Sequence, residues 1–254
     1  MKEFLQRLCR EAAAITWKHY GSTEVMYTKK SAADVVTKAD LESHHFCIER
    51  IEKAYPSHAI LSEEGEAGVQ GSKDLWVIDP LDGSRNFSTA TPLFGTMIAY
   101  VRDGEVLMAA ICLPATDELY FAEKGGGAFL NGKPIRCSQR EDWRESYGLG
   151  MVSMKAKHAA LMTKLGELAK EEPYWINTIG SMAVSAAYMA SGRRDWYFTM
   201  NGNVWDTSAP ALLLQEAGCV LTDMHGNAWK YGAKGILASN AKLHPTLVEL
   251  MKTV

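Results

Sequence analysis

Carboxylates recur in four short segments of this sequence where they could bind divalent cations. The segments are Asp34 to Asp40, Glu63-Glu64, Asp79 to Asp82, and Trp205-Asp206. We expect each acid at a strand end or a helix start, where a packed core gains nothing from charge. Hard cations such as Mg²⁺ select oxygen ligands and keep several waters that a substrate phosphate can replace. The four segments together therefore predict one cation site.

The segment 75–87 carries the strongest signal. An apolar run stops at Asp79, and a second carboxylate follows at Asp82. Because Pro80 has no N–H, we expect regular strand pairing to stop there. Gly83 allows a tight turn or the close approach of a ligand. If a short helix starts near Ser84, its first amides and positive dipole end would face a phosphate beside the two acids.

Each acid also has an ordinary structural interpretation. Asp79 and Asp82 suit a turn acid and a helix N-cap, and Asp40 suits the N-cap of the helix that follows it. Glu63-Glu64 suits a solvated loop. Asp206 could cap a helix expected over residues 207–217. That helix would tolerate Pro210 in its first turn and end at Gly218.

The order and spacing of these segments resemble the motifs of the Mg²⁺-dependent, lithium-sensitive inositol monophosphatase family, within the sugar phosphatase superfamily. The similar segments are residues 34–40, 62–65, 76–87, 125–138 and 205–218, so the resemblance spans residues 30–225. It implies a mixed α/β (α+β) fold, layered as an α-β-α-β-α sandwich. The N-terminal half (1–140) would carry most metal ligands, and the C-terminal half (141–254) would supply Asp206 and substrate contacts.

The resemblance implies Mg²⁺ as cofactor, with two to three ions per subunit. One ion would be held by Glu63, Asp79 and the carbonyl of Leu81, and a second by Asp79, Asp82 and Asp206, with a third, weaker ion near Glu63. Two cations about 3.5–4 Å apart can stabilise both the attacking and the leaving oxygen of an in-line displacement.

The implied catalytic residues are Asp40, Glu63 and Ser84. Ser84 stands where the family usually has threonine, and both residues offer a hydroxyl. With Asp40 it would orient the attacking water and help to deprotonate it. The implied substrate contacts are Gly83, Ser84, Gly180, Ser181, Ala183, Thr199 and Asp206.

The substrate is expected to be a small phosphorylated metabolite, such as inositol monophosphate. Thr199 lies seven residues before Asp206, where the family often has a glutamate that receives an inositol hydroxyl. Fructose 1,6-bisphosphate, a phosphoadenosine nucleotide and histidinol phosphate are therefore alternatives. Arg193 and Arg194 could meet a second phosphate or form a solvated surface pair. A regulatory binding protein on this scaffold is the alternative of another class.

Composition excludes several other classes. The 254 residues are 47% hydrophobic and 22% charged, which is enough to build a large core. The net charge is -3 and the 27 Lys and Arg are scattered, so we expect no nucleic-acid partner, and a nuclease would lack its basic track.

Five cysteines without a Cys-x-x-Cys spacing favour a reducing, cytoplasmic compartment. No apolar run approaches ~20 residues, so we expect no membrane span. The family forms homodimers, so the resemblance implies a homodimer here as well.

Helices, a meander and an α/β half are the elements that must position these acids. Apolar residues at helical spacing predict helices near residues 4–15 and 41–55, packed on a sheet. His44-His45 lies on the second helix, and we interpret the pair as partly buried or surface residues. Asp103-Gly104 between apolar runs predicts a hairpin over 96–113, which Asn131-Gly132 extends as a meander. After residue 145, strands alternate with helices.

Overall fold

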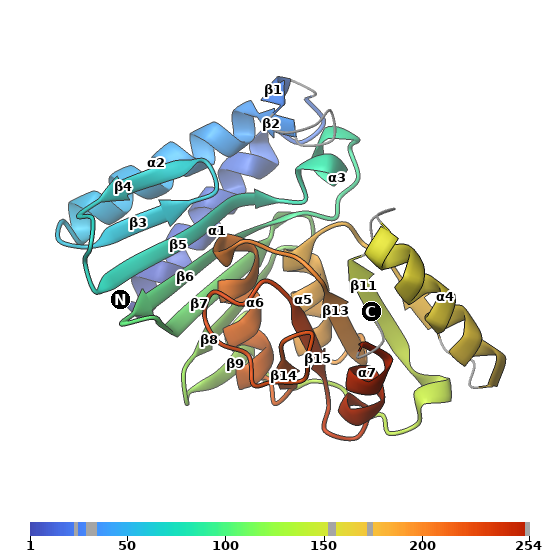
Figure 1. Cartoon of the computed structure of the whole chain (residues 1–254). Coiled ribbons are helices and arrows are strands. Elements are labelled where there is room, and N and C mark those ends of the chain that lie inside the picture. The colour runs from blue at the N-terminus through green and yellow to red at the C-terminus, as the bar shows by residue number, and fades with distance from the viewer. Residues whose placement is uncertain (23–24, 29–34, 152–155, 172–174, 252–254) are drawn as a thin grey trace.

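Helices and sheets alternate in five layers in the computed structural model, which describes residues 1–22, 25–28, 35–151, 156–171 and 175–251 (Figure 1). The order is α-β-α-β-α, so the predicted fold class is confirmed. Within the described residues, a small antiparallel pair, β1 (Val25–Thr28) and β2 (Val35–Thr37), lies beside the larger layers. Asp34, which begins the first acidic segment, lies outside the described residues.

The first large sheet forms the second layer, and its described strands follow the order β10-β9-β8-β7-β6-β5-β3-β4. In chain order they are β3 (Ala59–Ser62), β4 (Gly65–Gly68), β5 (Asp74–Asp82), β6 (Gly95–Arg102), β7 (Glu105–Leu113), β8 (Glu118–Glu123), β9 (Gly127–Leu130) and β10 (Lys133–Ile135). Neighbours pair antiparallel except β3 and β5, which pair parallel. The predicted hairpin and meander are therefore confirmed. Asp103 and Gly104 have φ of 51° and 76°, as the tight hairpin turn requires.

Helices α1 (Lys2–Lys18) and α2 (Lys38–Ala54) cover the outer face of this sheet. Leu5 of α1 and Ile51 of α2 are fully buried against Trp76 and Ile98 of the sheet. Residues one position along the strands, such as Val77, face the opposite side. This alternation follows from the two-residue period of a strand and gives the sheet two apolar faces.

Helices α5 (Met182–Ala190) and α6 (Val204–Glu216) fill the layer between the two large sheets. Their buried residues share one core with Met97 and Ile111 of the first sheet and Tyr197 of the second. Both helices are apolar on nearly every side, as a layer enclosed by two sheets requires. The core is thus continuous across the division expected near residue 140.

The second large sheet has the order β12-β11-β13-β15-β14 in the described residues. Its strands are β11 (Tyr147–Met151), β12 (Trp175–Asn177), β13 (Trp196–Thr199), β14 (Val220–Thr222) and β15 (Ile236–Ser239). Helices α4 (Ala156–Glu171) and α7 (His244–Met251) lie on its outer face, over Trp196 and Leu237. A Cβ at Gly148 would lie 2.1 Å from the Trp196 ring, so only glycine fits there.

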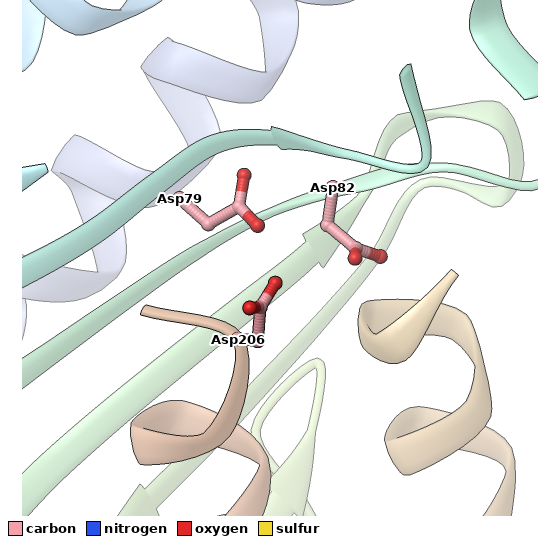
Figure 2. A group of neighbouring side chains, drawn as sticks. All are labelled: Asp79, Asp82 and Asp206. Carbon is pink, nitrogen blue, oxygen red and sulfur yellow. The ribbon is translucent and has the colours of Figure 1, made fainter. Parts of the chain in front are cut away.

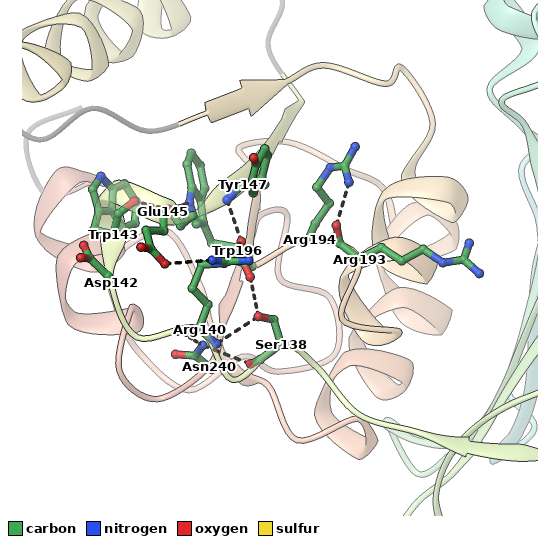
Figure 3. Close-up of polar contacts among 12 residues, drawn as sticks. Ser138, Arg140, Asp142, Trp143, Glu145, Tyr147, Arg193, Arg194, Trp196 and Asn240 are labelled. Atoms are coloured by element: carbon green, nitrogen blue, oxygen red, sulfur yellow. Dashed lines mark hydrogen bonds and ion pairs between the residues drawn. The ribbon is translucent and has the colours of Figure 1, made fainter.

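The segment that joins the two sheets is held by the polar contacts drawn in Figure 3. Asp195, just before β13, accepts hydrogen bonds from the Ser138 hydroxyl and from the backbone N–H of Tyr147, the latter at 2.7 Å. The Asn240 amide donates to the carbonyls of Ser138 and Arg140 at 3.1 and 2.6 Å. These bonds attach the connecting segment that begins at Ser138 to the second sheet. Short 3₁₀ helices lie at Pro114–Thr116 and Trp143–Glu145.

The helices of the described residues include none that combines the length and the apolar character of a membrane span.

Candidate metal centre

The end of β5 places two carboxylates beside each other. The strand runs to Asp82, but its regular pairing with β6 is interrupted between Asp79 and Asp82, so the stop of regular pairing predicted at Pro80 is confirmed. The missing N–H of Pro80 therefore costs no ladder bond. Gly83 then turns the chain with φ of 89°, and the predicted short helix α3 (Ser84–Ser88) begins. A Cβ at Gly83 would lie 3.0 Å from the Leu93 carbonyl oxygen, so glycine lets the backbone of residue 93 come close, and the approach of a ligand stays a prediction.

Asp206 enters from the second half, in the first turn of α6. The helix begins at Val204, earlier than the predicted residue 207, because Asn203 caps it. Asp206 is the third residue of the helix, and its carboxylate accepts a bond from the Asn203 N–H at 2.6 Å. Pro210 therefore lies in the helix interior and not in the first turn, where it leaves the carbonyl four residues earlier without its helical partner.

Asp79, Asp82 and Asp206 converge: one carboxylate oxygen of each lies within 4.8 Å of the others. Figure 2 shows the three side chains pointing toward one another. Asp79 is 1% exposed and Asp82 is 7% exposed. Burial, followed by the charges of Glu63, Asp82 and Asp206, raises the pKa of Asp79 well above its usual value. Burial also raises the pKa of Asp82. The three buried carboxylates repel one another, and a hard divalent cation bound between their oxygens would neutralise their charge.

Glu63 lies beside this group but not within its 4.8 Å radius. It occupies the turn between β3 and β4, where its N–H bonds to the carbonyl of Ile78 at 3.1 Å. The Glu63-Glu64 pair therefore forms the tight turn of the β3–β4 hairpin at the end of a strand. Its charge is the second cause of the raised pKa of Asp79, so Glu63 faces the same site.

Ser84, Asp40 and the carbonyl of Leu81 form a second group next to the acids. The Ser84 hydroxyl lies 3.0 Å from the Leu81 oxygen and 3.4 Å from Oδ1 of Asp40. The other oxygen of Asp40 accepts bonds from the N–H and the hydroxyl of Thr37, which caps α2. Burial raises the pKa of Asp40 to about 6, against the opposing effect of the Thr37 bonds. Asp40 is thus the third residue of α2 and not its N-cap.

The capping residues Thr37 and Asn203 were missed in the sequence. Thr37-Lys-Ala-Asp40 and Asn203-Val-Trp-Asp206 share one pattern, in which a capping residue precedes an acid by three positions. This is the capping box, and it fixes the acid at the start of a helix. The pattern would have shown that Asp40 and Asp206 are positioned by the same local device.

The predicted substrate turn approaches Asp82 directly. Ser181 caps α5, its hydroxyl donates to Oδ2 of Asp82, and the N–H of Ala183 donates to the same oxygen at 2.8 Å. Gly180 precedes this cap with φ of 77°. Thr199 ends β13; it is 1% exposed, and its hydroxyl donates to the Asn201 carbonyl at 2.9 Å.

The arginine pair lies in other contacts. The guanidinium of Arg193 forms an ion pair with Glu118 and lies 5.1 Å from the centre of the Tyr188 ring. Arg194 donates to the carbonyl of Arg193 at 2.7 Å (Figure 3). These contacts fit the surface-pair interpretation, and they leave the idea of a second phosphate site without support.

The raised pKa of Asp40 makes the stability of the protein depend on pH when EDTA has removed its cations. Asp40 titrates at about 6 in the folded state and at 3.8 unfolded, so the folded state binds this proton more tightly. In EDTA, the free energy of unfolding should therefore rise as the pH falls through this window, with Asp40 contributing on the order of 3 kcal/mol. Thermal unfolding of wild type and Asp40→Asn from about pH 8 to about pH 4.5 measures the effect.

Asparagine keeps the acceptor for Thr37 but does not titrate. The stability of the variant should therefore depend less steeply on pH than the stability of wild type. Asp79 and Asp82 are present in both proteins, so the difference between the two curves reports on Asp40. Parallel curves for the two proteins would contradict the assignment.

Known proteins with similar sequences and structures identify the family of this chain. The model of the family described as "Inositol monophosphatase family" matches residues 1–254. The chain is 32% identical over 254 residues to "Fructose-1,6-bisphosphatase/inositol-1-monophosphatase" of Thermotoga maritima, covering 99% of this chain and 96% of that protein. It is 35% identical over 227 residues to "Inositol-1-monophosphatase" of Rhizobium meliloti, covering 88% and 85%. The crystal structure of "extragenic suppressor protein suhB" from Bartonella henselae is similar at a TM-score of 0.92 and 29% identity, covering 98% of this chain and 97% of that chain.

Proposed function

Because the chain belongs to the inositol monophosphatase family, we propose that it is a phosphomonoesterase that uses Mg²⁺ to hydrolyse a small sugar or polyol phosphate. The observation that carries the proposal is the meeting of Asp79, Asp82 and Asp206 within 4.8 Å. A packed core has no use for three such acids, whereas a cation-dependent hydrolase needs them.

The acids divide into two sets of cation ligands. We assign Asp79, Asp82 and Asp206 to one Mg²⁺, and Glu63, Asp79 and the Leu81 carbonyl to another, with a third, weaker ion near Glu63. Bound cations supply charge neutralisation for the phosphate and the leaving oxygen. Asp79 belongs to both sets, which agrees with its deep burial and with the number of acids that raise its pKa.

Ser84 and Asp40 are assigned to the attacking water. The Ser84 hydroxyl can turn from the Leu81 carbonyl to Oδ1 of Asp40, which lies 3.4 Å away. In that orientation the oxygen of Ser84 accepts a hydrogen bond from the water, while its own proton moves toward Asp40. A base with a pKa of about 6 is ionised at neutral pH and still accepts a proton readily. Gly83 and Ser84, at the start of α3, are assigned to the phosphate.

Inositol monophosphate is the first substrate to test, because the Rhizobium relative is named for it. Fructose 1,6-bisphosphate is the second, because the Thermotoga relative is named for both activities and covers 99% of this chain. The similarity to a suppressor protein from Bartonella keeps a regulatory role as the alternative of another class. We also retain a homodimer in the cytoplasm, where the five buried cysteine thiols would stay reduced.

Phosphate release across a panel of esters tests the proposed function. The panel contains inositol phosphates, sugar bisphosphates, phosphoadenosine nucleotides and histidinol phosphate, each with and without Mg²⁺ and lithium. We expect Mg²⁺-dependent turnover of at least one ester by wild type and its near loss in Asp82→Asn, with circular dichroism showing that the variant is folded. Turnover that is equal in wild type and Asp82→Asn would refute the proposal.

A further inference from the structure

The Asp82 carboxylate is held by the opposite half of the molecule. Its Oδ2 receives the Ser181 hydroxyl and the N–H of Ala183, the latter at 2.8 Å. Ser181 and Asp82 are 99 residues apart in the chain. Two donors on one carboxylate oxygen fix its orientation and oppose the rise that burial causes in the pKa of Asp82.

We propose that the first turn of α5 is the receptor for the Asp82 carboxylate, and that Ser181 is a positioning residue of the cation site, an inference that rests on the proposed function. Asp82 lies at the end of a strand whose pairing is interrupted, so β5 alone does not fix its side chain. With Oδ2 held by α5, the carboxylate group has one orientation in which to meet Asp79 and Asp206. A site that must be preorganised gains from such second contacts.

The first turn of α5 packs closely against the strand end that carries Asp82, as this role requires. A Cβ at Gly83 would lie 3.2 Å from the Ser181 Cβ, and one at Gly95 would lie 3.0 Å from the Ala183 Cβ. Glycines on both sides of the Asp82 strand end thus let the helix approach. Asn86 of α3 ties the same region together, since its amide donates to the carbonyls of Leu93 and Ile179 at 2.7 and 2.8 Å.

Ser181 has little capacity left for a substrate. The side chain is fully buried, its proton goes to Asp82, and its oxygen accepts the N–H of Val184 at 3.2 Å. Donation from this hydroxyl to a substrate alcohol would cost its bond to Asp82, because a hydroxyl has one proton to donate. Ser181 was expected to bind substrate, and the contacts favour a role one step removed, through Asp82.

Direct titration with Mn²⁺, followed by electron paramagnetic resonance of the free ion, tests the inference in the full-length protein. Ser181→Ala should weaken Mn²⁺ binding about 10- to 100-fold, with an unchanged KM for the ester measured at saturating Mn²⁺. Ser181→Thr keeps the hydroxyl and suits the extended backbone of the cap, so it should restore most of the affinity. A rise in KM with unchanged Mn²⁺ affinity would overturn the positioning role and support substrate contact.

Ser185→Ala is the matched control on the same helix. Its hydroxyl donates to the Ser181 carbonyl at 2.6 Å and it is equally buried, but it does not contact Asp82, so Mn²⁺ affinity should stay at the wild-type value. Should Ser181→Ala fail to fold because the helix loses its cap, Ser181→Cys keeps the volume with a weaker donor and should show an intermediate loss. Wild-type affinity in the Ala or Cys variant overturns the inference alone, whereas wild type that binds no Mn²⁺ and hydrolyses no ester overturns the proposed function.

Discussion

Asp79→Asn is expected to lower kcat/KM by at least about a thousandfold and, in EDTA, to raise the stability of the cation-free protein. Activity should fall because Asp79 is assigned to both cations. Stability without cations should rise because the substitution removes a buried charge that Glu63, Asp82 and Asp206 all repel. The Leu81 N–H keeps an acceptor in the asparagine side chain, so the turn at the strand end should persist.

Steady-state kinetics with saturating Mg²⁺ and thermal unfolding in EDTA measure the two effects. Asp74→Asn is the matched control, since it makes the same substitution at the other end of β5. Asp74 pairs with Arg102 at 2.7 Å, near the surface, and its loss should leave kcat/KM unchanged. If Asp79→Asn keeps wild-type activity, or if it lowers the unfolding midpoint in EDTA, the charge cluster has been misread.

Ser84→Ala should lower kcat about 10²- to 10⁴-fold, the range typical of a lost acid–base partner. The substitution removes the hydroxyl that lies between the Leu81 carbonyl and Oδ1 of Asp40. Threonine supplies the same hydroxyl, so Ser84→Thr should stay close to wild type. Asp40→Asn should reproduce most of the alanine defect, because the two side chains act on one proton.

Kinetics of these variants across pH provide the measurement. Ser88→Ala is the control on the same short helix. The Ser88 hydroxyl donates to the Arg85 carbonyl at 2.9 Å, and the variant should remain fully active. A fully active Ser84→Ala variant would remove the serine from the mechanism. It would leave Asp40 to act on the water alone.

The ends of elements were predictable where local chemistry decides them. Asp103-Gly104 predicted its hairpin because few residues adopt positive φ twice in succession. Asp79 and Asp82 stood out because charge follows an apolar run abruptly. By contrast, β15 was missed: Ile236–Ser239 is buried on both faces, so it shows no alternation, and a short apolar run carries no distinctive period.

Contacts between distant residues could not be derived from the sequence. The bond from Ser181 to Asp82 depends on how α5 crosses the end of the first sheet, and no local pattern encodes that crossing. The burial of Thr199 has the same origin, because it follows from the pairing of β13 with β15, the strand that was not predicted. The capping boxes at Thr37 and Asn203 were different, since their signal was present in the sequence and was not used.

The central claim is that Asp79, Asp82 and Asp206 together hold a divalent cation. Anomalous diffraction from a crystal grown with Mn²⁺ tests it most directly, because the ion locates itself by its own scattering. We predict a strong peak bonded to an oxygen of each of the three carboxylates. A crystal in which the three side chains lie apart, or in which every Mn²⁺ peak lies elsewhere, would contradict the account.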